Sequence, residues 1–170
     1  MRFLGYGLIL VVGLLLETAG SPGLSLFGVK PELMLLLVML FTMIWGPRRG
    51  AAFGFCAGLL QDLLVGRFIG LNGIVLMLLA YTIGFITEQL FKENLLVRFA
   101  AVLGGTALGQ ILYLLGTAAF GMDISWPAIR WQAIVAASVV NALLSFALYK
   151  PLLAFDERLH YWHEVLKRTG

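Results

Sequence analysis

Six long apolar stretches, joined by short connectors rich in glycine, proline or charge, limit most strongly what this chain can fold into. They cover residues 3–19, 31–45, 50–65, 71–90, 99–120 and 131–149. Crossing a hydrocarbon core about 30 Å thick takes roughly 20 helical residues at about 1.5 Å each. The pattern therefore predicts an all-α membrane protein, a six-helix transmembrane bundle in which the second and third helices are short.

The composition supports a single bundle. Of the 170 residues, 61% are hydrophobic and 12% are charged, whereas a soluble domain is roughly half apolar and about a quarter charged. No Ser/Pro-rich linker divides the apolar stretches, so residues 1–150 are expected to form one transmembrane domain. The net charge of +3 does not indicate a nucleic-acid partner, because the basic residues stand at the ends of apolar runs rather than on one face.

Residues 151–170 have a different pattern. After Pro151, apolar side chains recur at helical spacing between charged ones. These residues are Phe155, Leu159, Trp162 and Leu166. The pattern predicts a cytoplasmic amphipathic C-terminal helix, which either lies on lipid headgroups or docks on a partner protein.

The distribution of Lys and Arg predicts the orientation, because basic loops are retained in the cytoplasm. With the N-terminus inside, nine basic residues are cytoplasmic: Arg2, Arg48, Arg49, Lys92, Arg98, Lys150, Arg158, Lys167 and Arg168. Only Lys30, Arg67 and Arg130 then lie outside. Both termini of this multi-pass protein are therefore expected in the cytoplasm. The alternative for the first stretch is a signal peptide cleaved near Ser21, but the preceding residues make a poor small-x-small cleavage site.

The third apolar stretch carries a ridge of small residues. Gly50, Gly54 and Gly58 are spaced four apart, which lets another helix approach closely, and Asp62 continues the ridge. An ionisable group this far into a span should face protein or water and by default marks a functional site. The alternative, equally weighted, is that Asp62 only fixes helix packing through hydrogen bonds.

The residues after Asp62 suggest a partner and a turn. Arg67 is the nearest basic residue, but five positions correspond to roughly 140° around a helix, so the two meet only if the helix unwinds near Gly66. Gly70 then begins a turn with Asn72 as the candidate N-cap of the next helix. A lipid-linked intermediate bound at Asp62 and Arg67 is a further possibility.

Polar residues follow the last two apolar stretches. Thr106, Gln110 and Tyr113 share one face of the fifth, and Asn141 lies in the sixth between Ser138 and Ser145. These groups either form interhelical hydrogen bonds or line a small cavity. We favour hydrogen-bonded packing.

The sequence lacks the residue combinations that known catalytic mechanisms need. There is no glycine-rich phosphate loop, no carboxylate cluster and no histidine in any span, so no catalytic residue and no cofactor is expected. His160 and His163 have a spacing that can bind metal, but no third ligand accompanies them, so no metal site is expected. The single cysteine, Cys56, is expected to be inert packing.

Three motifs together carry a resemblance to a family. Pro31-Glu32 before a leucine run, the stretch 54–66 around Asp62, and Ile69-Gly70-Leu71-Asn72-Gly73 are similar in order and spacing to the rod shape-determining protein MreD family. The likeness is close over the first half of the chain and is limited to hydropathy in the second. Carried over residue by residue, the motif positions are Pro31, Glu32, Gly58, Asp62, Gly66 and Gly70.

The resemblance implies a non-enzymatic component of the bacterial inner membrane that helps cells elongate as rods. It implies MreC as the main partner, the RodA and penicillin-binding-protein pair that builds lateral peptidoglycan as a further one, and the MreB cytoskeleton as an indirect one. It also implies a fold similar to the substrate-binding S-components of energy-coupling-factor transporters. The alternative function is therefore a vitamin-binding subunit of such a transporter, with the polar residues of the last two stretches as its pocket.

Overall fold

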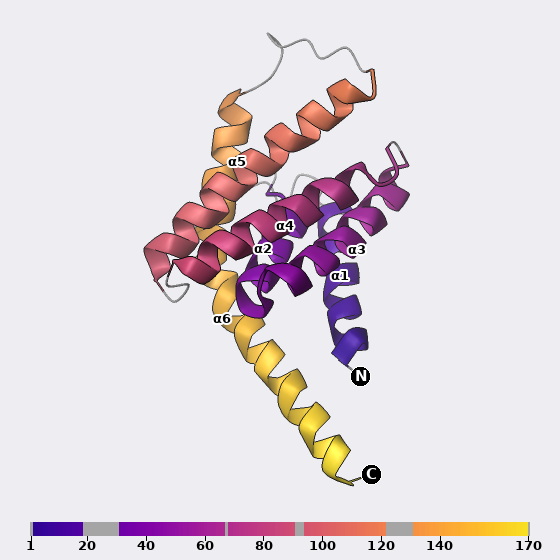
Figure 1. Ribbon diagram of the computed structural model, residues 1–170, viewed down its shortest axis with the longest axis vertical. Helices are drawn as coiled ribbons and strands as arrows, with labels where there is room; N and C mark the ends of the chain where they lie inside the picture. Colours follow the sequence, from indigo (N-terminus) through magenta and orange to yellow (C-terminus); the bar gives the residue numbers. More distant parts are fainter. Residues whose placement is uncertain (1, 19–30, 67, 91–93, 122–130, 170) are drawn as a thin grey trace.

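The computed structural model describes residues 2–18, 31–66, 68–90, 94–121 and 131–169. These residues form six helices: α1 Arg2–Thr18, α2 Leu33–Trp45, α3 Pro47–Val65, α4 Leu71–Gln89, α5 Leu95–Ala119 and α6 Trp131–Thr169. None of the described residues forms a strand. In Figure 1, α6 passes along the bundle and continues well beyond it. The predicted all-helical fold is confirmed.

Three of these helices are long and apolar enough to cross a membrane. They are Leu71–Gln89, Leu95–Ala119 and the part of α6 from Trp131 to Leu159. The segments Gly5–Glu17 and Leu33–Trp45 are apolar but shorter. Large apolar side chains are also exposed on the outer faces, among them Ile74, Leu78 and Phe85 on α4. An apolar outer surface over apolar helices of this length is what a lipid environment requires.

Helix α2 forms the centre of the bundle. Its 13 residues span about 20 Å, less than the roughly 30 Å of a hydrocarbon core. The side chains of Met34, Leu36, Met39, Leu40 and Phe41 have no exposed surface. All five other helices contact α2. A helix that is apolar on every side is stable only when it is enclosed in this way, and the predicted short second helix is confirmed.

Helices α2 and α3 are joined by one residue. Gly46 has a φ of +85°, a conformation that L side chains rarely adopt, and Pro47 follows as the first residue of α3. Helix α3 therefore begins three residues before the predicted position 50 and has 19 residues, as many as α4, so it is not the short third helix that the sequence predicted. Arg48 and Arg49 lie exposed in its first turn.

Helix α5 also begins earlier than predicted, at Leu95 rather than at residue 99. The reason is an N-cap: the Asn94 side-chain oxygen accepts a hydrogen bond from the Leu96 N–H at 3.0 Å. Arg98, assigned from the sequence to a cytoplasmic connector, consequently lies inside the helix and is buried.

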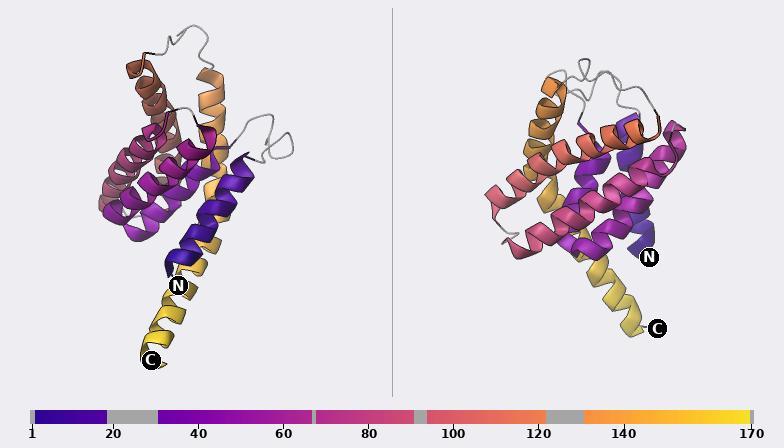
Figure 2. Two further views of the ribbon diagram at one scale, coloured as in Figure 1. Left: turned by 90° about the vertical axis from the view of Figure 1, so that its right-hand side faces the viewer. Right: turned by 45° about the horizontal axis from the view of Figure 1, so that its top comes forward.

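Helix α6 continues through the position where the sequence predicted an end. The apolar span was expected to stop at Tyr149, yet the helix includes Pro151 and ends only at Thr169. Contacts with α1 support the residues that follow the proline: a Cβ added at Gly5 would lie 2.9 Å from Leu159 Cδ1. Figure 2 shows α1 running beside α6. The two regions expected on either side of residue 150 are thus parts of one helix.

The uninterrupted course of α6 predicts that Pro151→Ala stabilises the protein. Proline in a helix interior lacks an N–H donor and costs up to about 3 kcal/mol relative to alanine, and Pro151 is exposed, so alanine loses little packing. The free energy of unfolding in detergent should rise. Pro22→Ala, which lies outside the described residues, is the composition-matched comparison. An unchanged or lower stability of Pro151→Ala would contradict a continuous helix.

Candidate functional site

Asp62 lies at the C-terminal end of α3 and is only 3% exposed. Its Oδ2 accepts hydrogen bonds from three backbone N–H groups: Gly70 at 2.8 Å, Asn72 at 2.9 Å and Gly73 at 3.4 Å. These groups belong to the N-cap residue and the first turn of α4. The first N–H groups of a helix have no partner within it and carry the positive end of its dipole. Asp62 therefore caps α4 from the preceding helix, a role that the sequence suggested for Asn72.

Two glycines shape the loop between Asp62 and α4. Gly66 ends α3 with a φ of +71°, and its N–H donates to the Asp62 carbonyl at 2.8 Å. Gly70 precedes α4 with a φ of +101°. Both values favour glycine. Arg67, the expected partner of Asp62, lies outside the described residues, so their pairing remains a prediction.

The ridge of Gly50, Gly54 and Gly58 is buried against helices of the same chain. A Cβ at Gly54 would lie 2.8 Å from the Leu76 carbonyl oxygen of α4. At Gly58 it would collide with the peptide between Asn72 and Gly73, and at Gly50 with Thr42 of α2. The small residues thus allow α3 and α4 to touch backbone to backbone beside the Asp62 cap.

A second carboxylate caps the central helix in the same way, and sequence reasoning missed it. Glu17, at the end of α1, accepts from the Met34 N–H through Oε2 at 2.9 Å. Its Oε1 accepts from Gln61 Nε2 at 3.0 Å. Met34 lies in the first turn of α2. The clue in the sequence was that Glu17 is the one acidic residue in the apolar stretch 3–19.

Pro31 and Glu32 lie directly before α2 on the inside of the bundle. Pro31 is buried. Gln110 of α5 lies next to the Glu32 side chain, and the Glu32 backbone carbonyl accepts from Asn141 Nδ2 at 3.3 Å. The start of α2 is therefore joined to both α5 and α6.

The expected polar interior is partly assembled. Asn141 Nδ2 also donates to Thr106 Oγ1 at 3.4 Å, which links α6 to α5. The Thr106 hydroxyl itself donates to the Val102 carbonyl of its own helix at 2.8 Å. Asn141 Oδ1 is buried without a hydrogen-bond partner. Tyr113 lies half-buried on α5, one turn beyond Gln110.

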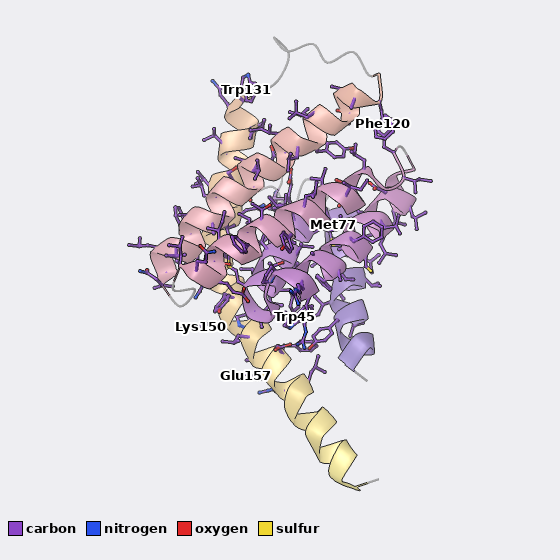
Figure 3. All side chains as sticks on the ribbon, in the orientation of Figure 1. Trp45, Met77, Phe120, Trp131, Lys150 and Glu157 are labelled. Atoms are coloured by element: carbon purple, nitrogen blue, oxygen red, sulfur yellow. The ribbon has the colours of Figure 1, made fainter. Side chains whose placement is uncertain are left out.

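A third cluster, not anticipated from the sequence, surrounds Asp156 on the extension of α6. Asp156 is buried, and its Oδ1 accepts from the Tyr6 hydroxyl at 2.6 Å and from Trp45 Nε1 at 2.8 Å. The rings of Tyr6 and Trp45 meet edge to face with centroids 4.4 Å apart. Trp45 is labelled in Figure 3, at the end of α2. One carboxylate thus joins α1, α2 and α6.

The buried carboxylates are engaged with backbone, amide, hydroxyl and indole donors, an arrangement that holds helices together. Within the described ranges, no three His, Cys, Asp or Glu side chains come together in a way that could hold a metal ion. The side chains of His160 and His163 lie outside that description. Cys56 is exposed on α3, not packed inside as expected.

A comparison with protein families gives a match over most of the chain. A family model described as rod shape-determining protein MreD matches residues 1–155. This range covers α1 to α5 and α6 as far as residue 155, and it includes Asp62 and the loop that follows it. No curated protein and no solved structure matches the chain significantly.

The capping geometry predicts that Asp62→Ala destabilises the fold. The substitution leaves three N–H groups at the start of α4 without their acceptor, and a buried unsatisfied donor costs about 1–3 kcal/mol. Asp62→Asn keeps an acceptor oxygen and should lose less. Thermal unfolding in detergent measures both, with the exposed Thr82→Ala as a control on α4. Equal stability of Asp62→Ala and the wild type would refute the cap.

The close approach of α3 and α4 predicts that one glycine substitution destabilises the protein and another does not. Gly58→Leu places a side chain against the backbone of α4, and overpacking of this kind costs about 1–3 kcal/mol or more. Gly104→Leu is the matched control, because no atom lies within 4 Å of a Cβ added there. Unfolding measurements should show a large loss for the first and none for the second. Similar losses in both would show that the α3–α4 contact is not the cause.

Proposed function

Because this chain belongs to the MreD family of rod shape-determining proteins, we propose that it is a non-enzymatic, inner-membrane component of the bacterial cell-elongation machinery. In this role it binds MreC and helps to position or regulate lateral peptidoglycan synthesis. The RodA and penicillin-binding-protein pair is the further partner, and the MreB cytoskeleton is reached indirectly. The family match over residues 1–155 is the observation that carries the proposal.

The chemistry of the interior supports a scaffold rather than an enzyme. A catalytic acid or base needs a proton that it can exchange with a substrate. Asp62 is instead surrounded by the N–H groups of α4, and Asp156 is held by Tyr6 and Trp45. Both carboxylates fix the relative positions of helices, which is what a docking platform requires.

The interior gives less support to the alternative of a vitamin-binding subunit. The hydroxyl groups of Ser138, Ser145 and Thr106 donate to backbone carbonyls of their own helices. Groups engaged in this way do not need a ligand to satisfy them. A vitamin found by mass spectrometry in the purified protein would favour the alternative.

The arrangement of the basic residues supports cytoplasmic termini. Tyr6, Trp45 and Asp156 meet, so the start of α1, the end of α2 and the extension of α6 lie at one end of the bundle. Arg48 and Arg49 follow Trp45 after only Gly46 and Pro47. Both chain ends lie toward this end in Figure 1. A basic end is retained in the cytoplasm.

Co-purification tests the partner. Affinity-tagged protein extracted in a mild detergent should retain MreC through washing and gel filtration. As a control, an unrelated tagged membrane protein with one transmembrane helix should not retain MreC under the same conditions. Absence of MreC from the wild-type complex would contradict MreC binding while leaving membership of the family intact.

Rescue of cells depleted of this protein tests the importance of the α3–α4 hairpin, which consists of α3, α4 and the loop between them. We expect Gly58→Leu and Asp62→Ala to restore rod shape poorly, because both loosen the hairpin, and Gly104→Leu to restore it fully. Cell width measured by microscopy, with membrane levels of each variant measured by immunoblot, gives the readout. Full rescue by Gly58→Leu and Asp62→Ala at normal membrane levels would show that the α3–α4 contact is not needed for rod shape.

A further inference from the structure

Arg98 is a buried cation in the first turns of α5. The residue is 6% exposed, and its Nε is enclosed without a hydrogen-bond partner. The guanidinium carbon lies 3.4 Å from the centroid of the Tyr149 ring on α6. Phe99 follows Arg98 on α5, and Phe146 lies one turn before Tyr149 on α6. Their rings stack with centroids 5.7 Å apart. The contact between α5 and α6 thus holds the guanidinium in place.

Within the described residues, the positive charge of Arg98 has no anionic partner. Among the described residues, no carboxylate forms an ion pair with Arg98. The buried Asp156 of the same helix as Tyr149 is bonded to Tyr6 and Trp45 instead. A ring face attracts a guanidinium but does not neutralise it. A buried charge is strongly disfavoured unless a counter-charge and hydrogen bonds compensate it, so the part of this site that the structure describes lacks an anionic component.

The surroundings favour an anion that carries apolar chains. Helical side chains lean toward the N-terminus of their helix, so Arg98 lies toward the first turn of α5, whose N–H groups carry positive partial charge. Lys150 follows Tyr149 and is exposed; it is labelled in Figure 3, close to where α6 leaves the bundle. On α6, Leu143 and Phe146 are large, apolar and exposed, and their spacing of seven and four residues before Lys150 puts them on its face of the helix.

We propose that Arg98 and Lys150 bind the phosphate group of an anionic phospholipid, with its acyl chains running toward the membrane interior against Phe146 and Leu143. The guanidinium donates to the phosphate oxygens, and Tyr149 holds its plane. Basic recesses between membrane helices recognise lipid headgroups through these interactions. The exposed apolar side chains beside the cations favour a lipid over free phosphate, because free phosphate has no apolar part that could contact them. This site is independent of MreC binding.

Native mass spectrometry of the purified, delipidated protein tests the proposal. Phosphatidylglycerol should bind at one preferred site, more tightly than phosphatidylcholine with the same acyl chains. Arg98→Gln should weaken that binding about tenfold, as expected for the loss of a charge-assisted hydrogen bond. Arg49→Gln removes the same charge from an exposed position and should change binding less than about twofold.

Three results would overturn the proposal. Unchanged phosphatidylglycerol binding by Arg98→Gln would remove the residue from the site. Equal weakening by Arg98→Gln and Arg49→Gln would show that only net charge matters. Displacement of phosphatidylglycerol by an equal concentration of inorganic phosphate would assign the site to the free anion. If Arg98→Gln does not fold, Lys150→Gln decides: a loss of severalfold supports the site and unchanged binding refutes it.

Discussion

The enclosure of α2 is the constraint on which the rest of the structure depends. Exposing a 13-residue helix with apolar side chains on every side to water is unfavourable. Contact with lipid alone stabilises it little. All five other helices therefore pack around it. Its first turn lies inside the bundle, where the free backbone N–H groups need partners supplied by other helices.

Carboxylates from neighbouring helices supply those partners. Glu17 of α1 accepts from the first turn of α2, and Asp62 of α3 accepts from the first turn of α4. Burying a carboxylate is unfavourable unless hydrogen bonds to it compensate. Here several N–H groups and the positive end of a helix dipole do so. The same interactions fix how consecutive helices are placed relative to each other.

Asp156 performs a similar task at the opposite end of α2. Its bonds to Tyr6 and Trp45 hold the extension of α6 against α1 and the end of α2. The direction in which α6 leaves the bundle follows from this contact, since the residues after Pro151 would otherwise be free to bend at the missing backbone hydrogen bond. The long projecting helix in Figure 2 is therefore anchored where it departs.

The sequence by itself determined the helical class, the short apolar second helix, the close approach at Gly54 and Gly58, and that Asp62 faces protein rather than lipid. Each of these follows from local composition or from spacing along one helix. Tertiary structure alone decided which helix fills the glycine ridge, that Asp62 caps α4, and that α6 runs past Pro151. It also decided the pairings of Glu17 with Met34, Asp156 with Tyr6, and Arg98 with Tyr149. The physical reason is that periodicity reports how deeply a face is buried, whereas a hydrogen bond between residues 150 positions apart depends on how whole helices are placed.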